Sequence, residues 1–169
     1  MRNITEILQE VKDKWSTPKK IPSQAESFVF VSYLEEPGFI PEDYPYQLPA
    51  DLIAFWSLVK SAILFKDIKY GQWGLEMLST EEALQKSRIQ LFHRPNEFRE
   101  WDLVIGQFYG DLDIVFINCD ETSSYFGRVY VAIPIDKRKD WCLVGENLTD
   151  FLDQYVRNEG EKYWEKRTG

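Results

Sequence analysis

The sequence is poor in the side chains that carry out most enzyme and metal chemistry. It has 169 residues but only 1 histidine, His93, and 2 cysteines, Cys119 and Cys142. Any pair of a nucleophile and a histidine would depend on His93, and no serine lies in a GxSxG motif. A zinc site would need His93, both cysteines and a carboxylate, and their spacing matches no zinc motif. We therefore expect no catalytic residue, no metal and no cofactor, and we place His93 on a loop.

The cysteines and the distribution of charge also bear on the compartment. Cys119 and Cys142 can form at most one disulfide and lack a CxxC spacing, so we expect both to be reduced and half-buried. Residues 1–15 carry charges throughout, unlike a signal peptide. The most apolar stretch, residues 52–65, is too short to span a membrane and contains Lys60. These features predict a cytoplasmic protein without a membrane partner.

Basic residues are outnumbered by acidic ones. Lys and Arg total 20 against 28 Asp and Glu, which gives a formal net charge of −8 at pH 7. A protein that binds the phosphate backbone needs a net basic face, so we expect no nucleic-acid partner. The hydrophobic share of 44% is close to the average for globular proteins. A chain of this length fits one domain, over residues 1–169.

Four helices are predicted from apolar residues spaced three or four apart and from the capping residues before them. They are Ile4–Trp15 after Asn3, a helix from Pro49 with the stripe Leu52, Trp56, Val59 and Ile63, a short helix from Thr80 after Ser79, and a last helix after Asn147. Residues 88–100 contain Pro95 and are expected to be mostly loop. The polar tail from Arg157 is expected to fray.

Strand-forming residues cluster in the second half of the chain. The predicted strands are residues 64–68, 73–78, 101–108, 113–118, 127–133 and 141–144. Short links favour antiparallel neighbours. Helices, then a run of strands, then a closing helix predict an α+β fold with one mostly antiparallel sheet and helices on one face or end. Residues 28–34 are also rich in strand formers, but a capping pattern at Ser23 and Glu26 leaves helix and strand both open there.

An acidic, proline-spaced segment precedes the helix at Pro49. Residues 35–51 contain five acidic residues and no Lys or Arg, and prolines recur every four residues from Pro37 to Pro49. Proline fixes φ and removes a hydrogen-bond donor, so residues 37–46 are predicted to form an extended loop. The segment is either an acidic recognition loop or a solvated connector, and the connector is the simpler interpretation.

A second group of acidic residues lies among aromatic ones on the links between predicted strands. Its members are Asp111, Asp113, Asp120, Glu121, Tyr109, Tyr125 and Phe126. No basic residue lies between Gln107 and Phe126. The group is open to three interpretations: ordinary loop charge, a carboxylate or metal site, and a protein-binding face. Aromatic anchors surrounded by acidic charge suit a basic protein partner, so we place the partner-binding residues here, on one edge of the sheet.

Four motifs occur in an order that resembles the SUKH superfamily, which includes fungal cell-wall-assembly regulators. They are Leu48-Pro49-Ala50-Asp51 with Phe55, similar to LPxDxxxF; Tyr70-Gly71-Gln72-Trp73-Gly74-Leu75 leading to Leu78-Ser79-Thr80-Glu81-Glu82-Ala83; Leu103-Val104-Ile105-Gly106 with Gly110-Asp111-Leu112-Asp113; and Asn147-Leu148-Thr149-Asp150-Phe151-Leu152. The resemblance covers about residues 23–156. It differs at Val59-Lys60-Ser61-Ala62, where many members have Asn-Gly, and in a longer proline-spaced stretch.

The resemblance implies a structure and a function beyond what the residues alone indicate. It implies a helix over residues 24–35. Bacterial members are immunity proteins that bind and neutralise toxin domains, often nucleases, of polymorphic toxin systems, and fungal members are regulatory interaction hubs. The implied function is a non-enzymatic, cytoplasmic immunity protein, or antitoxin, that binds a basic toxin domain. The alternative is a regulatory protein–protein interaction module without a toxin partner.

Overall fold

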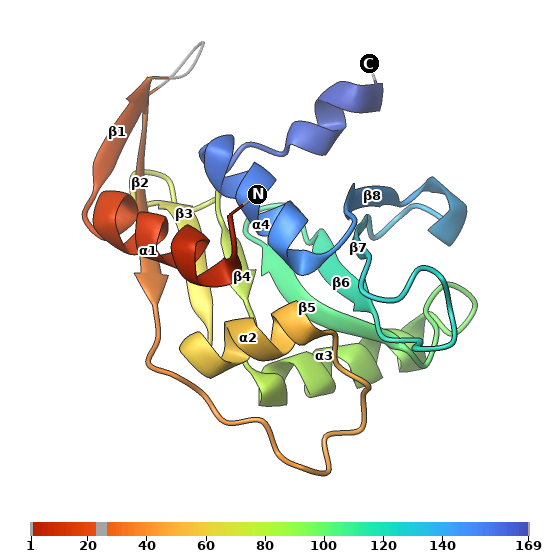
Figure 1. Cartoon of the computed structure of the whole chain (residues 1–169). Coiled ribbons are helices and arrows are strands. Elements are labelled where there is room, and N and C mark those ends of the chain that lie inside the picture. Colours follow the sequence, from red (N-terminus) through yellow and green to blue (C-terminus); the bar gives the residue numbers. More distant parts are fainter. Residues whose placement is uncertain (1, 23–26, 169) are drawn as a thin grey trace.

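The computed structural model describes residues 2–22 and 27–168, in which one eight-stranded sheet is surrounded by four α-helices (Figure 1). The elements in chain order are α1 (Ile4–Trp15), β1 (Lys19–Pro22), β2 (Ser27–Leu34), α2 (Ala50–Leu58), β3 (Ala62–Asp67), β4 (Leu75–Met77), α3 (Thr80–His93), β5 (Asp102–Phe108), β6 (Ile114–Asn118), β7 (Val129–Ala132), a 3₁₀ turn at Arg138–Asp140, β8 (Cys142–Gly145), α4 (Leu148–Arg157) and a 3₁₀ segment at Tyr163–Thr168. All neighbouring strands are antiparallel, and their order in the sheet follows the sequence. The α+β class is therefore confirmed.

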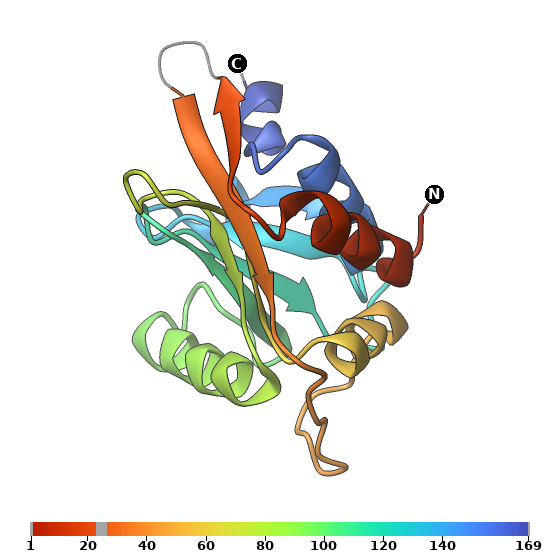
Figure 2. The same cartoon turned by 90° about the vertical axis from the view of Figure 1, so that its left-hand side faces the viewer.

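Helices lie on both faces of the sheet. Helices α1, α2 and α4 cover one face, and α3 lies alone against the other (Figure 2). Aromatic side chains fill the space between the sheet and the three-helix layer. Phe65 from β3 packs edge-on against Trp15 of α1 and Tyr155 of α4, with ring centroids 4.8 and 5.6 Å away. The apolar faces of α1 and α4 thus meet the sheet through one continuous core.

The helix starts follow the local signals in the sequence. The side chain of Asn3 accepts a hydrogen bond from the Glu6 N–H at 2.9 Å, and Asn147 likewise begins α4. Ser79 and Glu82 form a complete capping box at the start of α3, with bonds of 3.2 and 3.1 Å. These caps satisfy N–H groups that a helix otherwise leaves without partners. The predicted starts of all three helices are confirmed.

The helix implied for residues 24–35 is wrong. Residues 27–34 form β2, while residues 23–26 lie outside the part of the chain that the structure describes. Strand β2 pairs with β1 on one side and β3 on the other, and the Ser32 hydroxyl accepts a hydrogen bond from the Phe65 N–H at 2.9 Å. Pairing with two neighbours satisfies its backbone and suits its β-branched and aromatic residues, so the strand prevails over the capping pattern.

Helices α2 and α3 differ in length from the predictions. Helix α2 ends at Leu58, where Val59 turns to an extended φ of −141°, and Ile63 belongs to β3 rather than to the helical stripe. Helix α3 continues to His93, so residues 88–93 are helical and the prediction of a loop there is wrong. Its axis is anchored to the sheet by Ser87, whose hydroxyl accepts from the Val104 N–H at 2.7 Å. Pro95 then ends the helix, since proline cannot continue it.

The predicted strands in the second half are confirmed, but the tail is not frayed. Tyr163 and Trp164 are buried, at 7% and 2% exposure. Trp164 packs against Phe108 and Phe151, and the Tyr163 hydroxyl donates to the Val144 carbonyl. The tail therefore closes the core beyond the end of α4. Within the described residues, no helix is long and apolar enough to cross a membrane.

Candidate partner-binding surfaces

The predicted acidic and aromatic residues do not share one edge of the sheet. Tyr109, Asp111 and Asp113 lie in the turn between β5 and β6, whereas Asp120, Glu121, Tyr125 and Phe126 lie in the loop between β6 and β7. Strand β6 is antiparallel to both neighbours, so these two links lie at its opposite ends. The structure therefore divides the predicted face into two separate surfaces.

Two acidic residues of the β5–β6 turn share one basic partner from the tail. Lys162 forms an ion pair with Asp111 and places its Nζ 3.2 Å from the Oδ2 of Asp113. The same amine lies 4.6 Å from the centroid of the Phe108 ring. Burial raises the pKa of Asp113, and Lys162 offsets part of this effect. Asp113 and Lys162 are buried, so this cluster holds the turn to the tail, and of the three side chains only that of Asp111, at 46% exposure, reaches solvent.

Tyr109 is also engaged inside the molecule. Its hydroxyl donates to Glu76 Oε2 at 3.3 Å, and the Lys66 amine lies 5.5 Å from its ring centroid. Burial and the charge of Glu76 raise the pKa of Tyr109 to about 12. Tyr109 therefore remains a neutral hydrogen-bond donor at physiological pH and connects the turn to β4.

The β6–β7 loop is more accessible. Asp120 is held by an Asx turn, in which its Oδ1 accepts from the Thr122 N–H and hydroxyl at 3.1 and 2.7 Å. Glu121 is exposed, and Tyr125 is 50% exposed with the Arg128 guanidinium 4.4 Å from its ring centroid. A loop that is fixed by an Asx turn and carries an exposed tyrosine stacked on an arginine is well suited to contact a partner.

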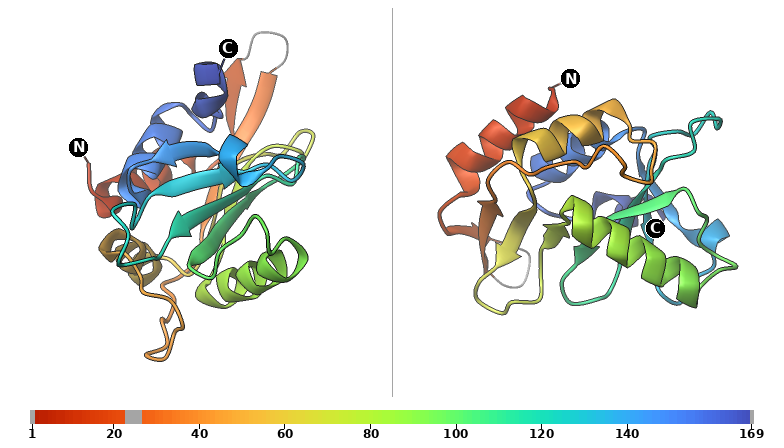
Figure 3. Two further views of the ribbon diagram at one scale, coloured as in Figure 1. Left: turned by 90° about the vertical axis from the view of Figure 1, so that its right-hand side faces the viewer. Right: turned by 90° about the horizontal axis from the view of Figure 1, so that it is seen from below.

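The acidic segment of residues 35–49 is a loop that crosses between α2 and α3 and is held in place by hydrogen bonds to both helices (Figure 3). The Tyr44 hydroxyl donates to the Thr80 carbonyl at 2.8 Å, and the Thr80 hydroxyl donates to the Phe39 carbonyl at 3.2 Å. The Gly38 N–H donates to the Trp56 carbonyl at 3.4 Å. These bonds fix the loop to the starts and ends of helices, so its side chains are presented in a defined arrangement.

Apolar and acidic side chains of this loop point outward. Phe39 is 77% exposed beside a hollow of about 260 Å³, although the loop backbone around it is hydrogen-bonded. Glu35, Glu36, Glu42 and Asp43 are exposed and form no ion pair with the described residues. Asp51, by contrast, accepts from the N–H and hydroxyl of Thr149 at 2.9 and 3.1 Å and joins α2 to α4. Four of the five acidic residues within residues 35–51 therefore remain available to a partner.

The loop and the β6–β7 link lie close to one another at the start of α2. A Cβ built on Gly127, whose φ is +89°, would lie 3.8 Å from the Cβ of Pro49. This approach places the last residue of the 35–49 loop against the end of the β6–β7 link. No local pattern predicts this proximity, because 78 residues separate the two positions.

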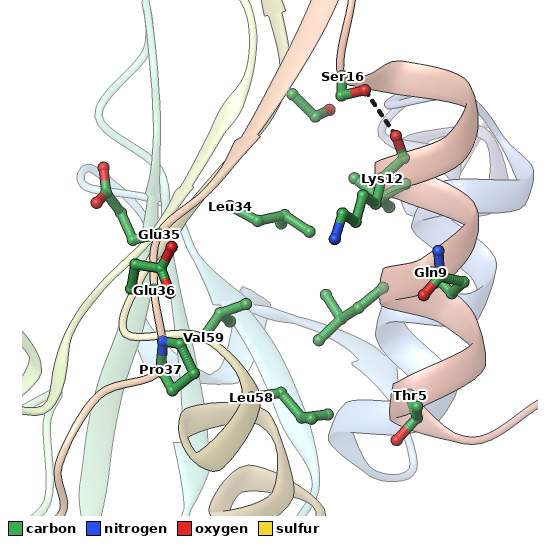
Figure 4. Close-up of a pocket in the computed structure, with 13 residues that line it drawn as sticks. Thr5, Gln9, Lys12, Ser16, Leu34, Glu35, Glu36, Pro37, Leu58 and Val59 are labelled. Carbon is green, nitrogen blue, oxygen red and sulfur yellow. Dashed lines mark hydrogen bonds between the residues drawn. The ribbon is translucent and has the colours of Figure 1, made fainter.

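A larger hollow of about 440 Å³ opens beside the other end of α2, between α1 and β2 (Figure 4). Leu34, Leu58 and Val59 approach it from the strand and α2, and α1 forms the opposite wall. The prediction of binding residues missed this hollow entirely. Its walls come from segments that only the folded chain brings together, and an apolar residue at its rim looks like any core residue in the sequence.

The residues considered for chemistry are dispersed. His93 is exposed at the end of α3, next to the Phe92 ring, rather than on a loop. Both cysteines are free, with Cys119 buried and Cys142 half-buried. Across residues 2–22 and 27–168, no group of three or more His, Cys, Asp or Glu side chains could hold a metal ion.

Comparison with known families gives one result. The model of the SMI1/KNR4 family (SUKH-1) matches residues 39–154, which is more than half of the chain. Comparisons with curated proteins and with solved structures gave no match. The match covers α2, α3 and the sheet from β3 to β8, together with most of α4. The chain therefore belongs to the SMI1/KNR4 family (SUKH-1).

Proposed function

We propose that the chain is a non-enzymatic immunity protein, which binds a toxin domain in the cytoplasm and blocks it. Membership of the SUKH-1 family over residues 39–154 carries this proposal. The net charge of −8 supports it, because nuclease toxins present basic surfaces to which an acidic protein associates quickly. The same membership is compatible with a regulatory protein–protein interaction module, and the test below separates the two.

We propose that the partner contacts the β6–β7 loop through Asp120, Glu121, Tyr125 and Phe126. Asp111 and Asp113 are paired with Lys162, and Tyr109 with Glu76, so we assign these three residues to the stability of the β5–β6 turn instead. Exposed acidic residues steer the encounter with a basic partner, whereas aromatic residues that become buried in the interface hold the complex together.

The test is a titration of the toxin domain encoded next to the gene of this protein. A toxin gene in that position whose product is bound and inhibited would support immunity, and its absence would favour the regulatory alternative. The variant Asp120→Asn/Glu121→Gln should associate more slowly and with a weaker salt dependence. Tyr125→Ala should mainly speed dissociation and cost about 2 kcal/mol of binding free energy.

A matched control separates local contact from net charge. Glu159→Gln/Asp140→Asn removes two negative charges at exposed positions, one after the end of α4 and one on the link between β7 and β8, away from the β6–β7 loop. If both double variants reduce the association rate equally, the loop contributes only to the overall field. If neither variant changes affinity or salt dependence while both remain folded, the partner binds elsewhere.

A further inference from the structure

A hollow of about 430 Å³ lies beside α3, on the face of the sheet that α3 covers alone (Figure 2). Its floor is a row of side chains across three strands, since Gln107 of β5 pairs with Ile114 of β6, and Ile114 pairs with Ala132 of β7. Directly paired residues of antiparallel strands point to the same face of a sheet. The floor of this site, which we call the α3 hollow, is therefore mainly aliphatic.

The wall that α3 contributes is basic. Lys86, Gln90 and Arg94 line the hollow and are spaced four residues apart, so they share one side of the helix. Of the residues that line the hollow, Lys86 and Arg94 carry charge and none is acidic. Neither cation forms an ion pair within the part of the chain that the structure describes. In a protein with a net charge of −8, this wall is a local reversal of sign.

The guanidinium of Arg94 is held in place before any partner arrives. Its Nη2 donates to the backbone carbonyl of Asp136 at 2.7 Å. Its central carbon lies 5.9 and 5.5 Å from the ring centroids of Phe98 and Trp141. A guanidinium has five N–H groups in a rigid fork, and this one uses a single N–H for a hydrogen bond to the described residues. The others are available to a carboxylate at little cost in ordering the side chain.

The β5–β6 turn forms another wall, and the carboxylates nearby have partners of their own. Asp111 and Asp113 are paired with Lys162, which holds the turn to the tail. The Tyr109 hydroxyl, in the same turn, donates to Glu76 at 3.3 Å. These contacts fix the turn and engage three carboxylates away from α3. The basic wall therefore faces a rigid wall rather than a competing acid.

Exposed apolar side chains surround the hollow. Leu112, which lines it from the turn, is 76% exposed and has a φ of +66°. The left-handed region is unfavourable for leucine, and in the free chain no burial of the side chain offsets this cost. Pro134 also lines the hollow and is exposed, and the next residue, Ile135, is 91% exposed. Apolar residues gathered beside a cleft are typical of a surface that a protein partner covers.

We propose that the α3 hollow is a docking site for an acidic segment of a protein partner, in which an Asp or Glu side chain pairs with Lys86 and Arg94. An aliphatic side chain next to it in the segment lies over Ile114 and Ala132 and covers Leu112. The two cations select the sign of the charge, and the fork of the arginine fits the two oxygens of a carboxylate. The aliphatic floor and rim select the neighbouring side chain.

The α3 hollow is separate from the surface proposed for a toxin. The β5–β6 turn and the β6–β7 loop lie at opposite ends of β6, and the charged side chains at the two sites have opposite signs. A basic toxin at the loop and an acidic segment at the hollow would therefore contact different parts of the chain. The inference goes beyond the proposed function and does not rest on it.

The experiment titrates the full chain with blocked tetrapeptides and follows backbone amide shifts by NMR. The probe Glu-Leu-Leu-Glu should shift the amides of Gln90, Gln107 and Leu112 and saturate at millimolar concentration. Glu-Gly-Gly-Glu and Arg-Leu-Leu-Arg should bind about fivefold more weakly, because each lacks one of the two features that the site recognises. Non-specific attraction to a protein of net charge −8 would instead favour Arg-Leu-Leu-Arg. Equal or tighter binding of either comparison peptide, or shifts confined to other parts of the molecule, would overturn the proposal.

Variants of the basic wall test the charge. Lys86→Gln should weaken binding of Glu-Leu-Leu-Glu about two- to fivefold, and Lys86→Glu about tenfold, because repulsion replaces attraction. Arg94→Lys keeps the charge but loses the fork, and should weaken binding about threefold. Lys12→Gln and Lys12→Glu make the same changes of charge at an exposed position of α1, on the other face of the sheet, and should stay within about twofold of wild type. If the Lys12 variants weaken binding as much as the Lys86 variants, the effect is one of overall charge and the proposal fails.

The variant Leu112→Gly tests the apolar rim. Glycine suits the left-handed backbone at this position, so the melting temperature should stay close to that of wild type. Binding of Glu-Leu-Leu-Glu should nevertheless weaken about threefold, because the aliphatic side chain is lost. An unchanged affinity in the folded variant would show that Leu112 takes no part, and would overturn the assignment of an aliphatic neighbour to the acidic side chain.

Two further outcomes separate the possible occupants. Concentration-dependent dimerisation that Lys86→Glu abolishes would show that the acidic surface of a second copy fills the hollow, and would overturn the assignment to another protein. Asp120→Asn/Glu121→Gln at the β6–β7 loop should leave binding of Glu-Leu-Leu-Glu within about twofold of wild type. If the peptide binds at the hollow but no toxin binds the chain, the docking site stands and the immunity function falls.

Discussion

The Nζ of Lys162 lies 3.2 Å from the Oδ2 of Asp113, although 49 residues separate the two in the sequence. Asp113 is 6% exposed and Lys162 is 8% exposed. The base that is missing from the sequence around Asp113 therefore comes from the tail. This pairing turns an apparent acidic binding element into an internal contact that closes the fold.

Replacement of Lys162 by methionine should destabilise the protein. Lys162→Met keeps the length of the side chain but leaves Asp113 buried without its opposite charge. We expect a loss of about 1–3 kcal/mol in the free energy of unfolding at pH 7, somewhat less than for a fully buried pair because Asp111 is partly exposed. Urea denaturation measures the loss, and Lys139→Met at an exposed position should change stability by less than about 0.5 kcal/mol.

The loss in Lys162→Met should depend on pH. Burial raises the pKa of Asp113 above its ordinary value of 3.8, so the folded state binds this proton more tightly than the unfolded state. The contribution of Asp113 to stability is therefore most favourable at low pH and falls as the pH rises through the carboxyl range. Removing Lys162 raises this pKa further, so the difference from wild type should grow between about pH 4 and pH 7. A difference that is constant over this range would contradict the assignment.

Trp56 should be a major determinant of stability. It is 1% exposed on α2, and its indole N–H donates to the Leu78 carbonyl at 2.9 Å. Trp56→Ala should cost about 3–5 kcal/mol by opening a large cavity. Trp56→Phe retains most of the volume and should cost about 1–3 kcal/mol, because the buried carbonyl loses its donor. Trp101→Ala, at 38% exposure, is the control, and a loss for Trp56→Ala below about 1 kcal/mol would contradict the packing of α2.

Features set by neighbouring residues were predictable from the sequence. The caps at Asn3, Ser79 and Asn147 act over three residues, and each begins a helix at the expected position. Apolar runs separated by turn residues likewise located β5, β6 and β7. In these segments the local conformational preference and the final packing agree, so the sequence pattern alone is sufficient to locate the helix or strand.

Features set by distant partners were not predictable. The local sequence of β2 permits a helix, and only its pairing with β1 and β3 decides for a strand. The tail around Trp164 looks polar because Lys162, Glu161 and Glu165 surround two buried aromatic residues.

The candidate surfaces depend even more on partners that are distant in the sequence. Asp113 was expected to face a partner but is paired with Lys162, and Leu34 and Leu58 line a hollow that exists only once α1 has packed.

Gly160 allows the tail to reach the core. Its φ is +85°, and a Cβ at this position would lie 2.6 Å from the Cβ of Phe65. Gly160→Ala should therefore cost about 2 kcal/mol or more, from both the left-handed backbone and the steric overlap. Gly71→Ala is a matched control, because Gly71 has a φ of +74° and nothing within 4 Å of the added Cβ. Only the backbone cost of about 1 kcal/mol should appear there. Equal losses for the two variants would show that the tail does not press against Phe65.

The two thiols should differ in reactivity. Burial, together with the nearby charge of Asp102, raises the pKa of Cys119 to about 12, so almost no thiolate is present at pH 8. Cys142 is half-buried, and burial raises its pKa as well.

A disulfide reagent at pH 8 should label Cys142 in the variant Cys119→Ser within the native state. In Cys142→Ser it should label Cys119 only at the rate at which the fold opens, because the thiolate is the reactive form and the side chain is 5% exposed. Addition of urea should accelerate labelling of Cys119 in parallel with unfolding. Rapid labelling of Cys119 in the native state would mean that the start of the β6–β7 loop opens independently of the core, and the surface proposed there for a partner would then be mobile rather than preformed.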